Sequence, residues 1–120
     1  LAYHGHPRYT GDIDFLVERS SANAALLVEV LHAFGFSHLG ITASDFQKPD
    51  IVVQLGRPPH RIDLLTSASG LEFTQAWQHR INATLDGLPV SMISKELLIQ
   101  NKRATQRAQD IADLKQLEDE

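Results

Sequence analysis

Two carboxylates stand at the head of the β-prone stretch DIDFLV, which begins at Asp12. The stretch has a period of two, which is the period of a β-strand because successive side chains point to opposite faces of a sheet. Ile13, Phe15 and Val17 therefore share one face, which we expect to enter the core. Asp12 and Asp14 share the other face, about 6.6 Å apart by strand rise. The stretch predicts a strand with a buried side and an acidic side.

Length and composition limit what can surround this strand. With 120 residues, the chain has room for one domain with a real core and is too short for two, so we expect a single domain over 1–120. No segment approaches the roughly 18 apolar residues of a membrane span. The absence of cysteine excludes disulfides and thiolate metal sites and fits a cytoplasmic location. A net charge of −4 argues against a broad surface for nucleic acid.

The first half of the chain alternates between strand and helix patterns. After the DIDFLV strand, Ser20 or Ser21 can cap a helix that ends at Gly35. Its apolar residues repeat at helical spacing and predict the buried stripe Ala24, Leu27, Val28, Leu31 and Phe34. The stretch GITASDFQKPD is expected to be a loop. IVVQLG and RIDLLT then read as two strands joined by the turn GRPPH, which favours an antiparallel hairpin.

The second half continues the same mixture of elements. SGLEFTQAWQHR predicts a short helix, in which Phe73 and Trp77 are expected to be core residues. INATLDGLPVSMI predicts a second hairpin that turns at Asp86 and Gly87. Ser94 can cap a helix over KELLIQNKRA, and RAQDIADLKQLEDE is expected to be helical. The fold class is therefore α+β, with a mixed sheet and flanking helices.

The aspartate pair suggests a metal site. Two like charges on one strand face repel each other, whereas a divalent cation between them reverses the sign of the interaction. Oxygen ligands of this kind suit Mg²⁺ or Mn²⁺ better than zinc. The alternative is that Asp12 and Asp14 merely begin a strand at the solvent edge. A zinc site using His4, His6 and His60 is a weaker alternative, because H-x-H has no further ligand at a fixed spacing.

A third carboxylate strengthens the metal hypothesis. Asp63 stands between apolar neighbours in the RIDLLT strand, where a lone acid is poorly tolerated. Three acids on neighbouring strands fit a two-metal phosphoryl-transfer centre, in which shared carboxylates bridge ions about 3.5–4 Å apart. The alternative for Asp63 is a structural salt bridge to Arg61 or Arg57.

These motifs together resemble a known family. HGHPRYTGDIDFLV, FGF, DIVVQLGRPPHRIDLLTSASGLEFTQAW and LLIQNKRATQRAQDIADLKQLE are similar to the small bacterial nucleotidyltransferase-like proteins of the DNA polymerase β superfamily. Within that superfamily the chain resembles the minimal nucleotidyltransferases and the abortive-infection toxin enzymes. The resemblance implies the palm fold of DNA polymerase β, a twisted mixed sheet flanked by helices. It also implies Mg²⁺- or Mn²⁺-dependent transfer of a nucleoside monophosphate from a nucleoside triphosphate to an acceptor.

The resemblance assigns roles to individual residues. Asp12 and Asp14 match the metal-binding D-x-D, and Asp63 matches the third catalytic carboxylate. Nucleotide-binding candidates are Arg8 and Thr10, which precede the pair, and Lys102 and Arg107 in NKRATQRAQDIADL. Gln106 and Gln109 replace the glycine and the lysine of the family pattern in that last stretch. The alternatives are a structural ion pair for Arg8 and a solvated helix face for Lys102 and Arg107.

Two functions are compatible with these patterns. The glycine-rich element that precedes the D-x-D in the family is absent, and residues 1–5 resemble the tail of the helix that follows it. We therefore expect a domain that lacks its N-terminal helix and glycine motif. One function is an active nucleotidyltransferase whose acceptor is a protein hydroxyl, an RNA end or a small molecule. The other is a catalytically inactive interaction module, such as one half of a toxin–antitoxin-like pair with a protein partner.

Overall fold

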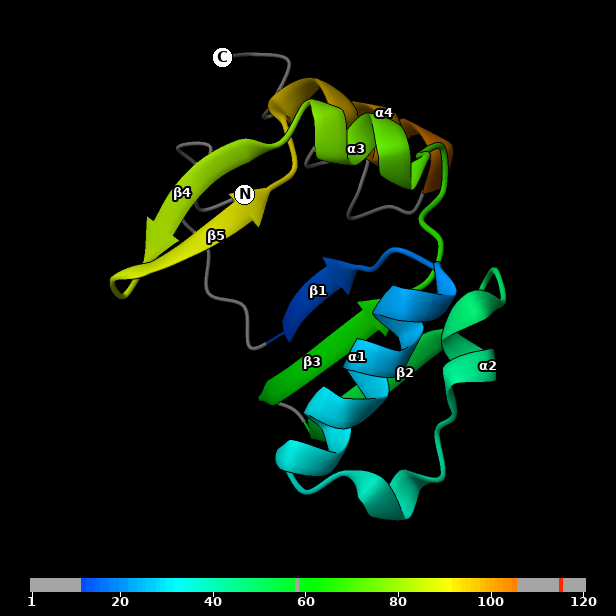
Figure 1. The fold of residues 1–120 in the computed structure, drawn as a ribbon. Coiled ribbons are helices and arrows are strands. Elements are labelled where there is room, and N and C mark those ends of the chain that lie inside the picture. Colours follow the sequence, from blue (N-terminus) through cyan, green and yellow to red (C-terminus); the bar gives the residue numbers. More distant parts are fainter. Residues whose placement is uncertain (1–11, 58, 106–114, 116–120) are drawn as a thin grey trace. The chain divides into compact units, whose positions relative to one another are not determined.

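The computed structural model describes residues 12–57, 59–105 and 115, and they form an α+β protein (Figure 1). In chain order the elements are β1 (Asp12–Leu16), α1 (Ser21–Ala33), the 3₁₀ helix η2 (Ser37–Leu39), α2 (Ala43–Gln47), β2 (Val52–Arg57), β3 (His60–Leu65), α3 (Phe73–Gln78), β4 (Ile81–Leu85), β5 (Leu88–Met92) and α4 (Lys95–Thr105). These elements fall into two compact units that divide after Ser67. The predicted α+β class is confirmed, and the single domain over 1–120 stays a prediction.

The first unit contains a mixed sheet of three strands in the order β1-β3-β2. β3 pairs in parallel with β1 and antiparallel with β2, so the predicted hairpin from β2 to β3 is confirmed. The hairpin depends on Gly56, whose φ of 81° is a conformation that favours glycine. A Cβ at this position would lie 2.7 Å from the carbonyl oxygen of His60. Any other residue at this position would therefore force the turn to shift.

Helices α1 and α2 cover one face of this sheet (Figure 1). Ser20 caps α1 as predicted, with its hydroxyl accepting a hydrogen bond from the backbone N–H of Asn23 at 3.2 Å. The core joins side chains from both helices to the helix-facing side of the strands. Its buried members are Val17, Ala24, Leu31, Phe46, Val53 and Leu55. Leu27 and Val28 of the predicted α1 stripe pack against this cluster.

Three apolar residues that we expected in the core are not buried. Ile13 and Phe15 are each 49% exposed and Phe34 is 76% exposed. Ile13 and Phe15 lie on β1, which is at the edge of the described sheet and pairs only with β3 there. Phe34 directly follows the last residue of α1. It comes ten residues after the buried Ala24, and at about 100° per residue its direction falls about 80° short of that of Ala24. Sheet order and helix phase therefore limit the core more than the apolar pattern indicates.

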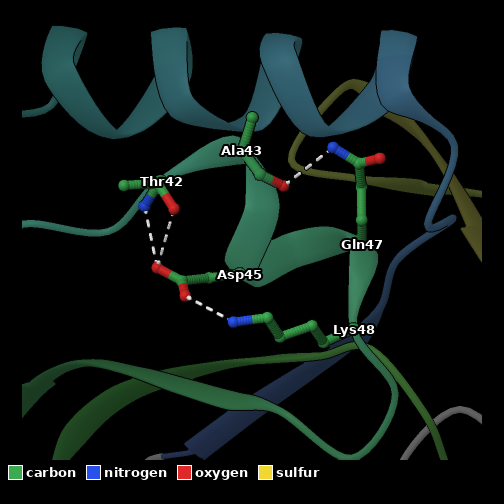
Figure 2. Close-up of polar contacts among 5 residues, drawn as sticks. All are labelled: Thr42, Ala43, Asp45, Gln47 and Lys48. Carbon is green, nitrogen blue, oxygen red and sulfur yellow. Dashed lines mark hydrogen bonds and ion pairs between the residues drawn. The ribbon is translucent and has the colours of Figure 1, made fainter.

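The segment expected to be a loop contains α2 and a central core residue. Asp45 and Thr42 form the cap of α2, in which the Asp45 carboxylate accepts hydrogen bonds from the backbone N–H of Thr42 at 2.9 Å and from its hydroxyl at 3.2 Å (Figure 2). Lys48 lies 3.9 Å from the same carboxylate. The cap orients α2 so that Phe46 is fully buried. The T-x-x-D spacing is the sequence signal that our loop prediction missed.

The second unit contains the hairpin of β4 and β5 together with α3 and α4. The predicted turn is confirmed, since Asp86 and Gly87 have φ values of 51° and 82°, as a two-residue hairpin turn requires. The predicted cap of α4 is also confirmed, because the Ser94 hydroxyl accepts a hydrogen bond from the backbone N–H of Leu97 at 3.3 Å. None of the helices in the described part of the chain has the length and apolar character needed to cross a membrane.

The core placement of Trp77 is wrong, because half of this residue is exposed. Its ring stacks on that of Phe73 with centroids 6.1 Å apart, and the Arg80 guanidinium lies 3.9 Å from the ring centroid of Trp77. Arg80 also donates a hydrogen bond to the carbonyl of Trp77 at 2.7 Å. The indole is thus held by Phe73 on its own helix and by Arg80 shortly after the end of that helix, rather than by a core.

Substitution of Phe46 tests the extent of the core. Phe46→Ala should lower the free energy of unfolding by about 3–5 kcal/mol, because it removes a fully buried ring and leaves a cavity. Phe34→Ala, the matched control on an exposed ring, should change it by no more than about 0.5 kcal/mol. Urea unfolding followed by circular dichroism measures both. Equal losses would show that Phe34 is packed and that our account of α1 is wrong.

The cap of α2 makes stability depend on pH. The backbone N–H of Thr42 holds the pKa of the Asp45 carboxyl below its ordinary value of 3.8, and Lys48 adds to this effect. Because the folded state favours the ionised form, the stabilisation is complete above that value and is lost as the pH falls through the folded pKa. Asp45→Asn should therefore be less stable than wild type near pH 7, and the gap should close in acid.

Thermal unfolding between about pH 7 and pH 3 measures this gap. Glu29→Gln, which removes one charge from the exposed face of α1, is the control and should leave the pH dependence unchanged. A gap of constant size across the range would assign the effect of Asp45 to something other than its charge.

Candidate metal-binding site

The parallel pairing of β1 with β3 brings two of the predicted carboxylates together. Asp14 is the register partner of Asp63, and Asp12 is the partner of Arg61. Register partners on neighbouring strands lie about 4.8 Å apart and point to the same face. Ile62 and Leu64, the neighbours of Asp63, alternate onto the helix-covered face. The acids therefore lie on the sheet face opposite α1 and α2.

A third polar residue extends this row. Gln54 on β2 is the register partner of Asp63, so the row Asp14, Asp63 and Gln54 crosses all three strands of the described sheet. Sequence patterns did not single out Gln54, because its place beside the acids depends on the hairpin register. The signal was its central position in IVVQLG, the one polar residue in an apolar strand. An amide side chain there can offer the site either an oxygen or a hydrogen-bond donor.

Asp63 is engaged by Arg61, two residues earlier on the same strand face. Nη2 of Arg61 donates a hydrogen bond to Oδ2 of Asp63 at 3.2 Å, and Nε lies 3.1 Å from Oδ1. The guanidinium therefore contacts both carboxylate oxygens. The salt bridge that we weighed against a metal role for Asp63 is thus present, and it is made by Arg61.

Burial raises the energetic importance of this pair. Asp63 is only 7% exposed, and a buried carboxylate without a partner is costly. The contact with Arg61 offsets that cost incompletely. The approach of Nε to Oδ1 does not have hydrogen-bond geometry, so Oδ1 is buried without a hydrogen bond. A buried acceptor in this state retains a desolvation penalty, which a further partner would relieve.

The described carboxylates are of the type that a hard divalent cation prefers. Asp14 and Asp63 could supply oxygen ligands from adjacent strands, and Oδ1 of Asp63 lacks a hydrogen bond. Within the residues that the structure describes, no group of three or more His, Cys, Asp or Glu side chains is placed to hold a metal. The third predicted ligand is Asp12, of which the structure describes the backbone in β1 but not the side chain.

None of the predicted nucleotide-binding residues lies on the described strands that carry these acids. Arg8, Thr10 and Arg107 lie outside the described residues. Lys102 lies on α4, in the second unit. His60 begins β3 three positions before Asp63, so strand alternation places it on the opposite face. The zinc alternative therefore gains no ligand for this site from His60, and His4 and His6 lie outside the described residues.

In comparisons with protein families, curated proteins and solved structures, no match to this chain was found.

Proposed function

We propose that this chain is a metal-dependent nucleotidyltransferase, which transfers a nucleoside monophosphate from a nucleoside triphosphate to a hydroxyl acceptor. The observation that carries the proposal is the register of Asp14 with Asp63 on adjacent parallel strands, two register pairs away from Asp12. Paired carboxylates on one sheet face are the arrangement that a two-metal phosphoryl-transfer centre needs. The acceptor is a protein hydroxyl, an RNA end or a small molecule.

The fold that we propose is the palm of DNA polymerase β. Its support is a mixed sheet with helices on one face and the acids on the other, together with the motifs G-x-P-R-x-T-x-D-I-D and R-I-D-L-L-T. The helices pack on the side of the sheet that carries Val53, Leu55 and Leu64. The acidic face is thereby left as the side on which a nucleotide and its metal ions could be held.

The proposed chemistry assigns a role to each acid. Asp12 and Asp14 would hold a cation that binds the triphosphate. Together with Asp63 they would hold a second cation near the acceptor hydroxyl. Bound Mg²⁺ or Mn²⁺ would neutralise phosphate charge and lower the pKa of the attacking hydroxyl. The hydroxyl would lose its proton to solvent and form a bond from its oxygen to the α-phosphorus, while the bond from that phosphorus to the bridging oxygen breaks and pyrophosphate leaves. Arg8, Thr10, Lys102 and Arg107 remain candidates for phosphate contacts.

Calorimetry of nucleotide binding tests this proposal. Wild type should bind a non-hydrolysable nucleoside triphosphate in the presence of Mg²⁺ and lose that binding with EDTA. Asp12→Asn and Asp14→Asn should each weaken binding at least about tenfold, because each removes an anionic oxygen ligand without changing side-chain size. Asp86→Asn is the control and should bind like wild type, since Asn suits the positive φ of its hairpin turn.

The absence of Mg²⁺-dependent triphosphate binding by wild type would overturn the enzyme proposal. Equal binding by wild type and Asp14→Asn would also overturn it, because the register of Asp14 with Asp63 would then have no bearing on the ligand.

A second candidate function is a catalytically inactive interaction module, such as one half of a toxin–antitoxin-like pair. It is favoured by the exposed apolar residues Leu26, Val30 and Phe34, which follow one another at four-residue steps along α1 and its C-terminal cap. A helix of a soluble monomer usually presents polar residues there, and a row of exposed apolar side chains is typical of an interaction surface. The same calorimetry separates the two functions, because a module requires no Mg²⁺-dependent triphosphate binding.

A further inference from the structure

Arg61 occupies the carboxylate that the proposed metal site needs. Two donors of one guanidinium, Nε and Nη2, contact the two oxygens of Asp63 from a position on the same strand face. A divalent cation would draw on the lone pairs of the same oxygens. The two positive groups would also repel each other at such short range. Arg61 and the cation are therefore rivals for Asp63.

Arginine is the member of this pair that can move. Its guanidinium stays protonated in proteins, so it can leave Asp63 only by swinging away. The Arg61 side chain is 29% exposed against 10% for that of Asp63, and it has a long flexible stem. Asp63 has a short side chain on the central strand of the described sheet, paired on both sides by β1 and β2. Of the two side chains, that of Arg61 therefore has the greater freedom to change its contacts.

The contact between Arg61 and Asp63 leaves one carboxylate oxygen without a hydrogen bond, which favours replacement of Arg61 by a cation. Oδ1 of Asp63 is buried and accepts no hydrogen bond, even though Nε lies 3.1 Å away. A cation can approach this oxygen without the angular demands of an N–H donor. The exchange would relieve a buried acceptor that Arg61 serves poorly.

We infer that Arg61 is a resident counterion of Asp63 that competes with the divalent cation and lowers its affinity. The inference rests on the proposed metal site and adds a positioning residue to it. While Arg61 holds Asp63, the buried charge is balanced; when the cation binds, Arg61 releases at least one oxygen. The residue thus sets the cation concentration at which the site assembles.

Titration with Mn²⁺ tests the competition directly, with free Mn²⁺ followed by electron paramagnetic resonance and no nucleotide present. Arg61→Gln should bind Mn²⁺ about tenfold more tightly than wild type, because one positive charge beside the cation is gone. Arg61→Lys keeps the charge but can reach only one oxygen, so it should bind about threefold more tightly. The Lys variant also serves if the Gln variant does not fold.

The control is Arg57→Gln, which removes the same charge from β2. Arg57 is the register partner of His60, so it lies on the face opposite Asp63. Its Mn²⁺ affinity should match that of wild type within about twofold, because Arg57 lies on the other face and three register pairs away from Asp63. If Arg57→Gln raised the Mn²⁺ affinity as much as Arg61→Gln, the effect would come from the change in net charge alone, and the inference would be overturned.

The outcomes separate this inference from the proposed function. If wild type binds Mn²⁺ and both Arg61 variants bind it equally or more weakly, the metal site stands and the competition is wrong. In that case Arg61 supports the site instead of opposing it. If neither wild type nor any variant binds Mn²⁺, the proposed function fails and the competition fails with it.

Discussion

The parallel pairing of β1 with β3 is the constraint on which the first unit depends. Two parallel strands cannot be joined by a tight turn, so the chain must cross over between them. Here α1, η2, α2 and β2 supply that connection, and α1 and α2 pack onto one face of the sheet in doing so. The opposite face carries Asp14, Asp63 and Gln54. The register that forms the fold is thus the same register that places Asp14 beside Asp63.

The local elements could be predicted from the sequence because their signals are local. The cap at Ser20, the turn at Asp86 and Gly87, and the cap at Ser94 each require only a few neighbouring residues. Helix α2 was missed because its five residues carry too little helical periodicity and its burial of Phe46 depends on tertiary contacts. The signal that it does leave in the sequence is the T-x-x-D cap at Thr42 and Asp45.

The composition of the core and of the candidate site could be predicted only in part. Alternation assigned Asp12 and Asp14 to one face, but it could not show that β1 lies at the edge of the described sheet, where Ile13 and Phe15 remain half exposed. It also could not place Gln54 beside Asp63, since that depends on the register of β2. Period-two patterns specify a face, and strand order specifies how deeply that face is buried.

Strand order also makes the two described carboxylates unequal. Asp14 is exposed on the edge strand, whereas Asp63 is buried on the strand between β1 and β2 and is held by Arg61. An exposed carboxylate keeps much of its hydration, so its charge costs little, but a buried ionised carboxylate is costly without a partner. In a site built from this pair, water can compensate the charge of Asp14, whereas the charge of Asp63 needs a cationic partner. The arginine that makes Asp63 tolerable during folding is for that reason the group that any metal must meet there.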